Sequence, residues 1–315
     1  MICDLRQSQE ESRAQNDLRI ECSQLNMNPW RDLRSRIRRF NRWEAIMSRR
    51  TDPAVETLYA QLYDLSVPDW PGEMDFYRAL IGDRKPEEVN LLEVASGTGR
   101  VALQLAREGT NVVGLDHSEW MLDVARSKSR GIQNVRWARG DMRSFDLGER
   151  FTCAIIPGHA FQNLVTPEDQ TACLECIKRH LVPGGKLVVH LDHMGHENTI
   201  WLGSLRGCKG GVFEPGQVLI HPETGRRIQT SQAWTYEPST QTASLLMVWE
   251  EIDADGKVTS RWERGPIRLH CVFRFEMRHL LERAGFEIEA VYGDFHRGAL
   301  SDDSSDMLWV ATNRQ

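Results

Sequence analysis

The sequence lacks the features of a membrane-spanning, secreted or nucleic-acid-binding protein. It has no run of about eighteen apolar residues, so no membrane span is expected. The first residues carry Asp4, Glu10 and Glu11 without an apolar core segment, which argues against a secretory signal. The formal net charge of −6 argues against general nucleic-acid binding. We expect a cytoplasmic protein with neither a membrane nor a nucleic-acid partner.

Cysteine is scarce and irregularly placed. The seven cysteines are odd in number and scattered, which indicates reduced thiols rather than a disulfide framework. Cys173 and Cys176 form the one CxxC pair, in a segment with a helical pattern and with no second pair nearby. A zinc site needs about four such ligands, so no metal is predicted.

What is present is a repeated strand–helix pattern, of which residues 90–116 are the most informative part. Leu91 to Val94 form a short buried-strand pattern, followed by a glycine turn and a helical pattern over residues 100–108. A second buried strand, Val112 to Leu115, ends in Asp116. Such a unit lets the backbone approach a nucleoside closely, while the acid faces the ribose hydroxyls.

Two classes of cofactor use this unit. Residues 97–102 match G-x-G-x-x-A, the dinucleotide fingerprint. S-adenosylmethionine (SAM) is favoured because Glu93, at the end of the first strand, can face an ammonium group but would repel a pyrophosphate. Asp141, in a Gly-Asp-Met segment after a third apolar run, can accept from an adenine amino group. A Pro-Gly-Gly turn at residues 183–185 then leads into a strong strand.

Together these segments resemble the class I SAM-dependent methyltransferases, in particular the small-molecule group with a methyltransferase domain 25-like core. The resemblance extends from about Leu58 to the C-terminus and includes Tyr63-Asp64 and Trp70 with Phe76-Tyr77. Ala95 departs from it, since the family usually has glycine there, and alanine is expected to fit if its φ is negative. The resemblance implies a SAM site formed by Tyr63, Glu93, Ala95, Ser96, Gly97, Gly99, Arg100, Asp116, His117, Met121, Asp141, Met142 and Pro157.

The predicted fold is α/β, with a Rossmann-like, doubly wound, seven-stranded and mostly parallel sheet. An N-terminal extension is expected over residues 1–57 and the SAM-binding core over 58–194. An antiparallel β insert over 195–271 is expected to cap the acceptor pocket, and residues 272–315 should add a helix and the last two strands. Within the extension, Asn28 and Pro29 begin a helix whose apolar stripe runs from Trp30 to Met47. We expect this helix to act as a lid over the cofactor; binding at a membrane surface is an alternative.

Candidate catalytic residues follow the fourth and fifth strands, because open parallel sheets bind ligands at the carboxyl ends of their strands. His159 could accept a proton from an amine or hydroxyl, and His193 is a second candidate on the acceptor side. His190 and His193 would point to opposite faces of a continuing strand, which argues against a metal site. The expected acceptor-binding residues are Tyr77, Phe161, Gln162, Trp201 and Trp234.

Three functions remain open from the sequence. The first is transfer of a methyl group from SAM to a nitrogen or oxygen atom of a small molecule. The second is a SAM-consuming enzyme of the same fold that cyclises or cleaves SAM without methyl transfer. The third is an NAD-binding oxidoreductase or a non-catalytic nucleotide-binding module. The sequence does not predict the oligomeric state.

Overall fold

The computed structural model describes residues 52–67, 70–81, 85–205 and 212–314. The expected helix from Trp30 to Met47, and with it the lid, lies outside the described residues. Within them, no helix combines the length and the apolar character needed to cross a membrane.

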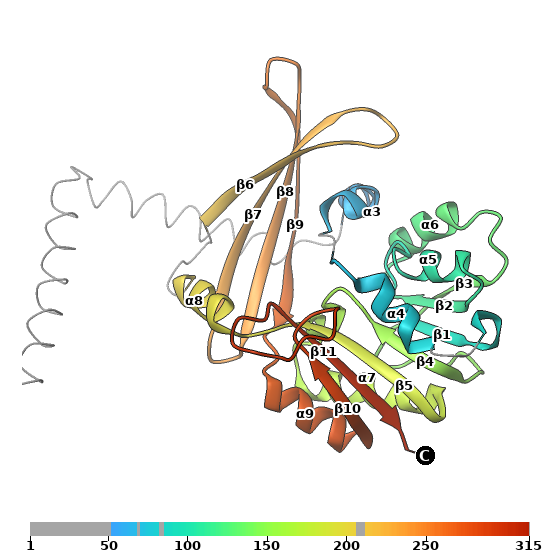
Figure 1. Ribbon diagram of the computed structural model, residues 1–315. Coiled ribbons are helices and arrows are strands. Elements are labelled where there is room, and N and C mark those ends of the chain that lie inside the picture. The colour runs from blue at the N-terminus through green and yellow to red at the C-terminus, as the bar shows by residue number, and fades with distance from the viewer. Residues whose placement is uncertain (1–51, 68–69, 82–84, 206–211, 315) are drawn as a thin grey trace, which may run out of the picture. The chain divides into compact units, whose positions relative to one another are not determined.

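A seven-stranded sheet forms the core (Figure 1). Its strand order is β10-β11-β5-β4-β1-β2-β3, and β11 alone runs antiparallel to its neighbours. This confirms the predicted mostly parallel, doubly wound sheet. The strands are β1 (Asn90–Val94), β2 (Asn111–Asp116), β3 (Val135–Arg139), β4 (Phe151–Ile156), β5 (Leu181–Asp192), β10 (Phe286–Tyr292) and β11 (Asp306–Asn313).

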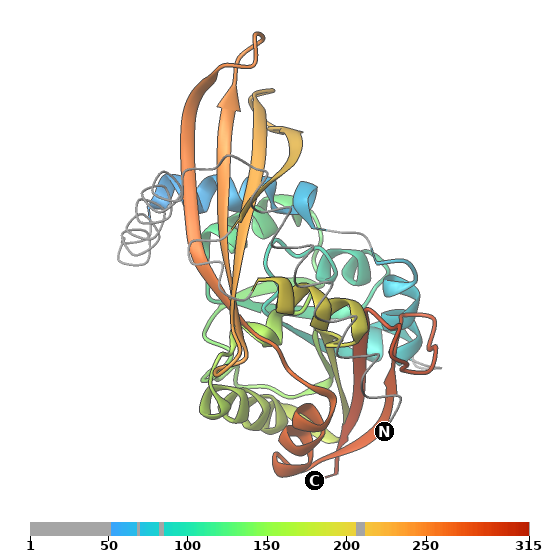
Figure 2. The same cartoon turned by 90° about the vertical axis from the view of Figure 1, so that its left-hand side faces the viewer.

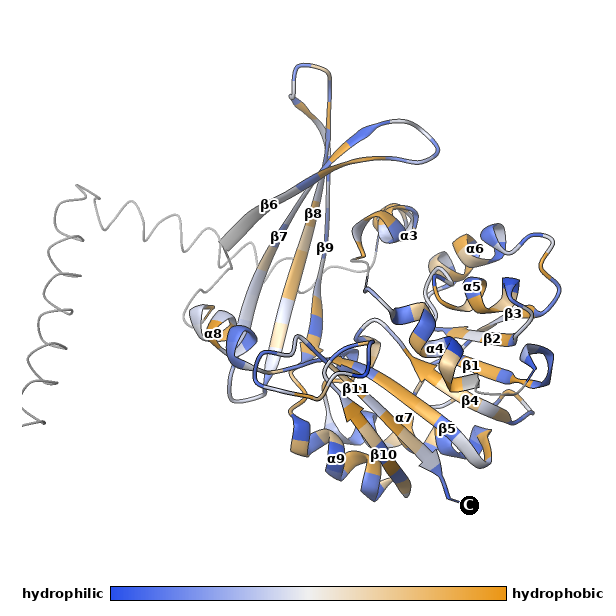
Figure 3. Ribbon diagram, viewed as in Figure 1, coloured by the Kyte–Doolittle hydropathy of each residue, from blue (hydrophilic) through white to orange (hydrophobic). Residues whose placement is uncertain are grey.

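Helices cover both faces of this sheet, because alternate strand residues point to opposite sides. Leu91 packs into an apolar cluster with α4 and α5, and its neighbour Leu92 packs into another with α7 and α9. The apolar residues of the central strands stand out in Figure 3. The helices around the sheet are α3 (Pro53–Ser66), α4 (Glu73–Ile81), α5 (Ala102–Arg107), α6 (Glu119–Lys128), α7 (Pro167–His180) and α9 (Arg274–Arg283), with short 3₁₀ turns η1 (Pro86–Glu88) and η2 (Ala160–Asn163).

Local capping explains where the predicted helices begin. The Ser118 side chain accepts a hydrogen bond from Met121 N at 3.4 Å, which caps α6. Thr166 caps α7 by accepting from Asp169 N at 3.2 Å, and Pro167 occupies the first turn. Gly285 follows the end of α9 with φ +80°, the left-handed conformation common after a helix C-terminus.

The insert is a four-stranded antiparallel meander (Figure 2). Its strands are β6 (Val212–Ile220), β7 (Arg227–Glu237), β8 (Thr242–Ile252) and β9 (Val258–His270), in the order β6-β7-β8-β9. This confirms the predicted antiparallel β insert after the fifth strand. The sequence pattern does not reveal β6 because Pro215-Gly216 interrupts it, and the register with β7 shifts between Pro215 and Val218. Helix α8 (His196–Ser204) was also not predicted, since only Leu202 in it is buried.

Candidate cofactor and acceptor site

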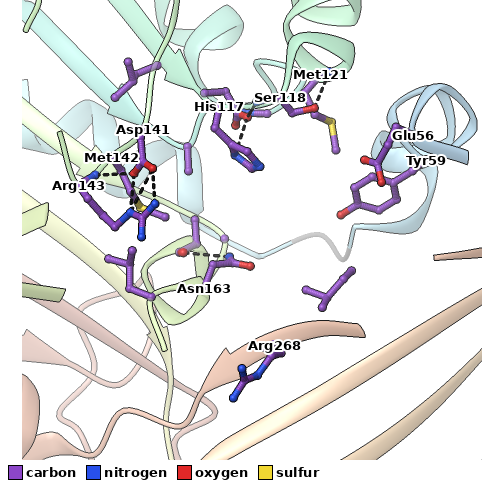
Figure 4. A pocket seen from close by; sticks show the side chains of 18 of the residues that line it. Glu56, Tyr59, His117, Ser118, Met121, Asp141, Met142, Arg143, Asn163 and Arg268 are labelled. Carbon is purple, nitrogen blue, oxygen red and sulfur yellow. Dashed lines mark hydrogen bonds and ion pairs between the residues drawn. The ribbon is translucent and has the colours of Figure 1, made fainter. Parts of the chain in front are cut away.

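A cavity of about 640 Å³ opens at the carboxyl ends of β1 to β4, in the size range of small-molecule sites. Helix α3 and strand β9 of the insert form its remaining walls (Figure 4). The lining includes Glu56, Tyr59, Tyr63, Ala95, Gly97, Asp116, His117, Ser118, Met121, Asp141, Met142, Arg143, Gly158, Ala160, Asn163, Asp169 and residues 264–268.

The turn after β1 brings backbone to the cavity surface. Gly97 has φ +54°, and a β-carbon added there would point into the cavity, with only Tyr63 Cε1 nearby at 3.9 Å. That open space is what close approach of a ligand requires. Gly99 has a different role from the one expected, because a β-carbon there would collide with the Trp137 ring, and Gly99 is not part of the cavity lining.

The backbone conformation of Ala95 differs from the one expected. Alanine was expected to fit with a negative φ, but its φ is +57°, in the left-handed region. For an L-residue this conformation costs about 1–2 kcal/mol. The surrounding turn stabilises it, because Ser96 N donates to Leu115 O at 2.9 Å and Gly99 N donates to Ser96 O at 2.8 Å.

Asp116 is held rigidly at the end of β2. Its two carboxylate oxygens accept one backbone hydrogen bond each, from Gly97 N and from Ser118 N, both at 2.8 Å. Each oxygen keeps a lone pair for a further donor. A fixed carboxylate of this kind, facing a cavity, fits the two hydroxyls of a ribose.

Asp141 lies at the end of β3 beside a cation that the sequence did not single out. Arg143 contacts its carboxylate through two nitrogens, with a shortest distance of 2.6 Å, and also reaches Asp169 at 3.0 Å. These hydrogen bonds from Arg143 hold the pKa of Asp141 below its usual range. Asp141 therefore remains an ionised hydrogen-bond acceptor at the cavity wall.

Two buried polar atoms near the end of β1 have no partner among the described residues. They are Glu93 Oε2 and Ser96 Oγ. Glu93 is only 2% exposed, and burial raises its pKa to about 8. Arg100 does not neutralise it fully, because its guanidinium forms an ion pair with Glu73. Buried polar groups are normally paired, so these two atoms are unusual, although neither residue is part of the cavity lining.

His159, after β4, does not line the cavity, although its neighbours Gly158 and Ala160 do. Its Nε2 lies 3.2 Å from Asp306 Oδ1, and its Nδ1 lies 3.2 Å from Asp192 Oδ1. Both ring nitrogens therefore face protein carboxylates. His193 is separate from this group, with its backbone N donating to Ser305 O at 2.8 Å and burial lowering its side-chain pKa.

The expected acceptor residues do not line the cavity. Tyr77 and Phe161 are fully buried in the core. Pro157, which was expected at the SAM site, is also buried and lies outside the lining. Gln162 is buried and donates to His270 O at 3.2 Å. Trp201 and Trp234 pack edge to face at 5.3 Å, outside the lining. The sequence did not indicate five of the lining residues, which are Glu56, Tyr59, Asn163, Arg264 and Arg268. For the two arginines, the Gly265-Pro266 break within β9 was an available signal.

Three side chains converge closely enough to suggest a metal site. One ligand atom each from His159, His190 and Asp306 lies within 4.8 Å of the others. Gly158 N donates to His190 Nδ1 at 3.3 Å, so the proton of a neutral His190 is assigned to Nε2. That nitrogen would have to be the metal ligand, and a protonated nitrogen cannot bind one. The hydrogen-bond pattern therefore favours a network without a metal.

Comparison with known proteins indicates that the chain is a methyltransferase. A family model described as a methyltransferase domain matches residues 91–185. The chain is 33% identical over 138 residues to dTDP-3-amino-3,4,6-trideoxy-alpha-D-glucopyranose N,N-dimethyltransferase of Streptomyces venezuelae, over 42% of this chain and 57% of that protein. Its matches to three amino-sugar dimethyltransferases cover only 51–60% of their length.

Two similarities extend over nearly the whole of the related protein. A Bacillus subtilis protein, YqeM, described only as a candidate methyltransferase, is 30% identical over 80% of this chain and 95% of its own length. The SAM-bound structure of CalS10, an amino pentose methyltransferase from Micromonospora echinaspora, is 25% identical with a TM-score of 0.57, and the match covers 81% of this chain and 96% of CalS10. With YqeM matched over nearly its whole length, the chain belongs to the class I SAM-dependent methyltransferases, and SAM is its cofactor.

Proposed function

We propose that the protein methylates the nitrogen of a small-molecule amine that also carries an anionic group. The observation that carries this proposal is the guanidinium of Arg268 in the cavity wall, which pairs with no carboxylate among the described residues. The names of the three dimethyltransferases support nitrogen over oxygen, because each acts on an amino sugar.

The cofactor would lie along the carboxyl ends of β1 to β3. Asp116 would accept from the ribose hydroxyls, Asp141 from the adenine amino group, and Glu93 would face the ammonium. SAM supplies a methyl group on a sulfonium sulfur, which leaves as a neutral thioether and keeps the C–S electron pair. No acid is needed for that leaving group, so the protein has to position the amine, exclude water and remove a proton.

An ion pair between the insert and α3 closes the cavity on the side away from the sheet. Arg264 of β9 donates to the Glu56 carboxylate at 2.9 and 3.2 Å. Its guanidinium also lies over the Tyr59 ring, 4.0 Å from the centroid. A guanidinium held in this way adds both charge pairing and stacking. It would keep the insert over the acceptor side of the cavity and limit the entry of water.

Arg268 differs from the other two arginines of the lining. Arg143 is paired with Asp141 and Asp169, and Arg264 with Glu56. Among the residues that the structure describes, no carboxylate pairs with Arg268. Figure 4 shows it on β9, across the cavity from His117 and Asp141. A free guanidinium suits a phosphate or carboxylate of the acceptor. The dTDP-sugars named for the relatives carry such phosphates.

The test is methylation of dTDP-amino sugars, each compared with the hydroxyl analogue of the same sugar. Mass spectrometry should show one or two added methyl groups on the amines and none on the hydroxyl analogues. Arg268→Met should raise KM for a dTDP-amino sugar about tenfold, the scale of one lost charged hydrogen bond. It should leave KM for the free amino sugar unchanged.

Arg261→Met is the matched control, because Arg261 is also on β9 but pairs with Glu250 and Glu263. Methylation of the hydroxyl analogues instead of the amines would refute nitrogen as the acceptor atom. If Arg268→Met changes KM equally for the dTDP-amino sugar and the free amino sugar, Arg268 does not bind the anionic group.

A further inference from the structure

Four polar side chains from three segments meet at the acceptor end of the sheet. His159 follows β4, His190 and Asp192 lie in β5, and Asp306 begins β11, where it pairs in register with Asp192. Their side-chain exposure falls from 36% for Asp192 to 21% for His159, 12% for Asp306 and 0% for His190. Asp192 is therefore the outermost member of this acid–histidine cluster.

The hydrogen bonds of the cluster fix the inner three groups. His190 Nε2 lies 2.8 Å from Asp306 Oδ1 and, with its proton assigned to that nitrogen, donates to it. Ser305 Oγ donates to the other oxygen of Asp306 at 2.5 Å. The Trp70 ring packs edge to face against His159 and His190, with centroids 5.4 and 5.2 Å apart. His159 is thus clamped, with its Nδ1 directed at Asp192.

The strand order places Asp192 beyond the cofactor. Along the carboxyl edge of the sheet, Asp141 ends the β3 segment, Asp116 ends β2 and the glycine turn ends β1. The next two strands are β4 and β5, each about 4.8 Å further along. A ligand whose adenosine lies over β2 and β3 and whose methionine end lies over β1 leaves the ends of β4 and β5 for the acceptor.

We propose that Asp192 binds the acceptor amine as an ammonium and takes up its proton, and that His159 is a positioning residue for Asp192. This inference rests on the proposed amine acceptor. The amine first gives a proton to the Asp192 carboxylate, which frees its lone pair. That lone pair forms the new C–N bond, and the nitrogen then carries one positive charge. The methylated nitrogen loses this charge by releasing a second proton. Asp192 can accept that proton after it has passed the first one to solvent.

The carboxylates of Asp192 and Asp306 have different surroundings, which indicate different roles. Burial raises the pKa of Asp192 above its usual value, although His159 and Gln162 oppose this effect. Asp306 and the thiol of Cys271 are the other titratable groups facing it. Hydrogen bonds from His159, His190 and Ser305 hold the pKa of Asp306 below its usual range. Asp306 thus stays ionised and anchors His159, whereas Asp192 is the better proton acceptor.

The test compares two ligands that need no methyl transfer. Sinefungin has a CH–NH2 group where SAM has its S–CH3 group, so its amine stands at the methyl position. S-adenosylhomocysteine has only the unmethylated sulfur there. If Asp192 faces that position, Asp192→Asn should weaken sinefungin binding about 10–100-fold and leave S-adenosylhomocysteine binding unchanged by calorimetry. Asp303→Asn removes an exposed carboxylate from the loop before β11 and should change neither affinity. Equal effects on both ligands in Asp192→Asn would overturn the proposal.

The positioning role has its own readout. With an amine that the enzyme methylates as substrate, Asp192→Asn should lower kcat about 100-fold or more. The loss should shrink at high pH, where the amine is already deprotonated without a base. His159→Gln should lower kcat less and shift the same pH profile, and unchanged profiles would overturn its role. A stoichiometric metal in the purified protein, whose removal abolishes sinefungin discrimination, would also overturn the proposal. If no amine is methylated but sinefungin discrimination depends on Asp192, the proposed function fails and the placement of Asp192 stands.

Discussion

The proposed cofactor and acceptor sides of the site differ in how far apart in the sequence their contacting residues lie. On the cofactor side, at the ends of β1 to β3, Asp116 accepts from Gly97 and Ser118, which are 19 and 2 residues away. On the proposed acceptor side, behind the cavity lining at the ends of β4 and β5, Asp306 meets His190 and His159 across 116 and 147 residues of sequence. Arg264 meets Glu56 across 208 residues. Local backbone geometry thus forms the cofactor side, and tertiary packing forms the acceptor side.

This difference predicts that one residue in the local turn can abolish SAM binding. In Gly97→Val, a branched side chain would enter the cavity from a backbone with φ +54°. Calorimetry should show no SAM binding, while the circular dichroism spectrum stays close to wild type. Gly131→Val is the control, because Gly131 has φ +87° and open space around it, away from the cavity. Normal SAM binding by Gly97→Val would mean that the turn is only structural.

A second change on the cofactor side should have a large but incomplete effect. Asp116→Ala removes the proposed partner of both ribose hydroxyls and the acceptor for two backbone N–H groups. We expect SAM binding to weaken by about 1.5–3 kcal/mol, the scale of a lost charged hydrogen bond. Asp255→Ala, in an exposed turn of the insert, should bind SAM as the wild type does. Unchanged SAM affinity in Asp116→Ala would refute its assignment.

Glu93 should make both stability and SAM binding depend on pH. Its pKa is raised to about 8 by burial, so the folded protein without SAM keeps a proton that the unfolded chain loses above pH 4.5. The free energy of unfolding should therefore fall as pH rises from about 4.5 to about 8, by at most about 1.4 kcal/mol per pH unit. Denaturant titrations across this range should show a smaller slope in Glu93→Gln.

SAM binding tests the same group independently. An ammonium beside Glu93 favours its ionised form, so binding near neutral pH should release up to about one proton. Calorimetry in buffers of different ionisation enthalpy measures this release. Release that is as large in Glu93→Gln as in the wild type would assign the proton to another group.

The smallest effect is expected from the ion pair between β9 and α3. Arg264→Met should raise KM for the acceptor about three- to tenfold and change the Kd of SAM little, since it loosens the wall over the acceptor side. Glu56→Gln should do the same, and the double variant should be no worse than either single one, because the two residues act as a pair. Additive losses, or a loss confined to SAM affinity, would place the pair on the cofactor side instead.

The sequence predicted the sheet, and it identified two acids at the cavity wall, because both features depend on short sequence segments. Alternating strands and helices predict a parallel sheet, and the acids at 116 and 141 mark strand ends that line the cavity. The left-handed Ala95 could not be predicted, because the turn that stabilises it overrides the preference of alanine. Strand β6 was missed because Pro215-Gly216 breaks its pattern.

The acceptor side was predicted less well for a related reason. Aromatic residues were natural candidates for a pocket wall, yet Tyr77 and Phe161 are buried because they fill the two faces of the sheet. Arg264 and Arg268 resemble any other arginine of a strand until the fold brings β9 over the cavity. His159 was identified by its place after β4, but its partner Asp306 depends on the register of β11, which no local pattern specifies.

That register determines where the chain can tolerate insertions and deletions. Asp306, the first residue of β11, pairs with Asp192, and side chains along a strand alternate between faces. Removing one residue within β11 would shift the strand and present Ser305 or Met307 where Asp306 now anchors His159. A residue lost from the loop at 297–303 changes the connection without changing the register. Neighbouring single-residue deletions should therefore separate into two groups. Those in the loop should be tolerated, and those in the strand should lose the acid–histidine cluster and move buried side chains such as Trp309 to the other face of the sheet.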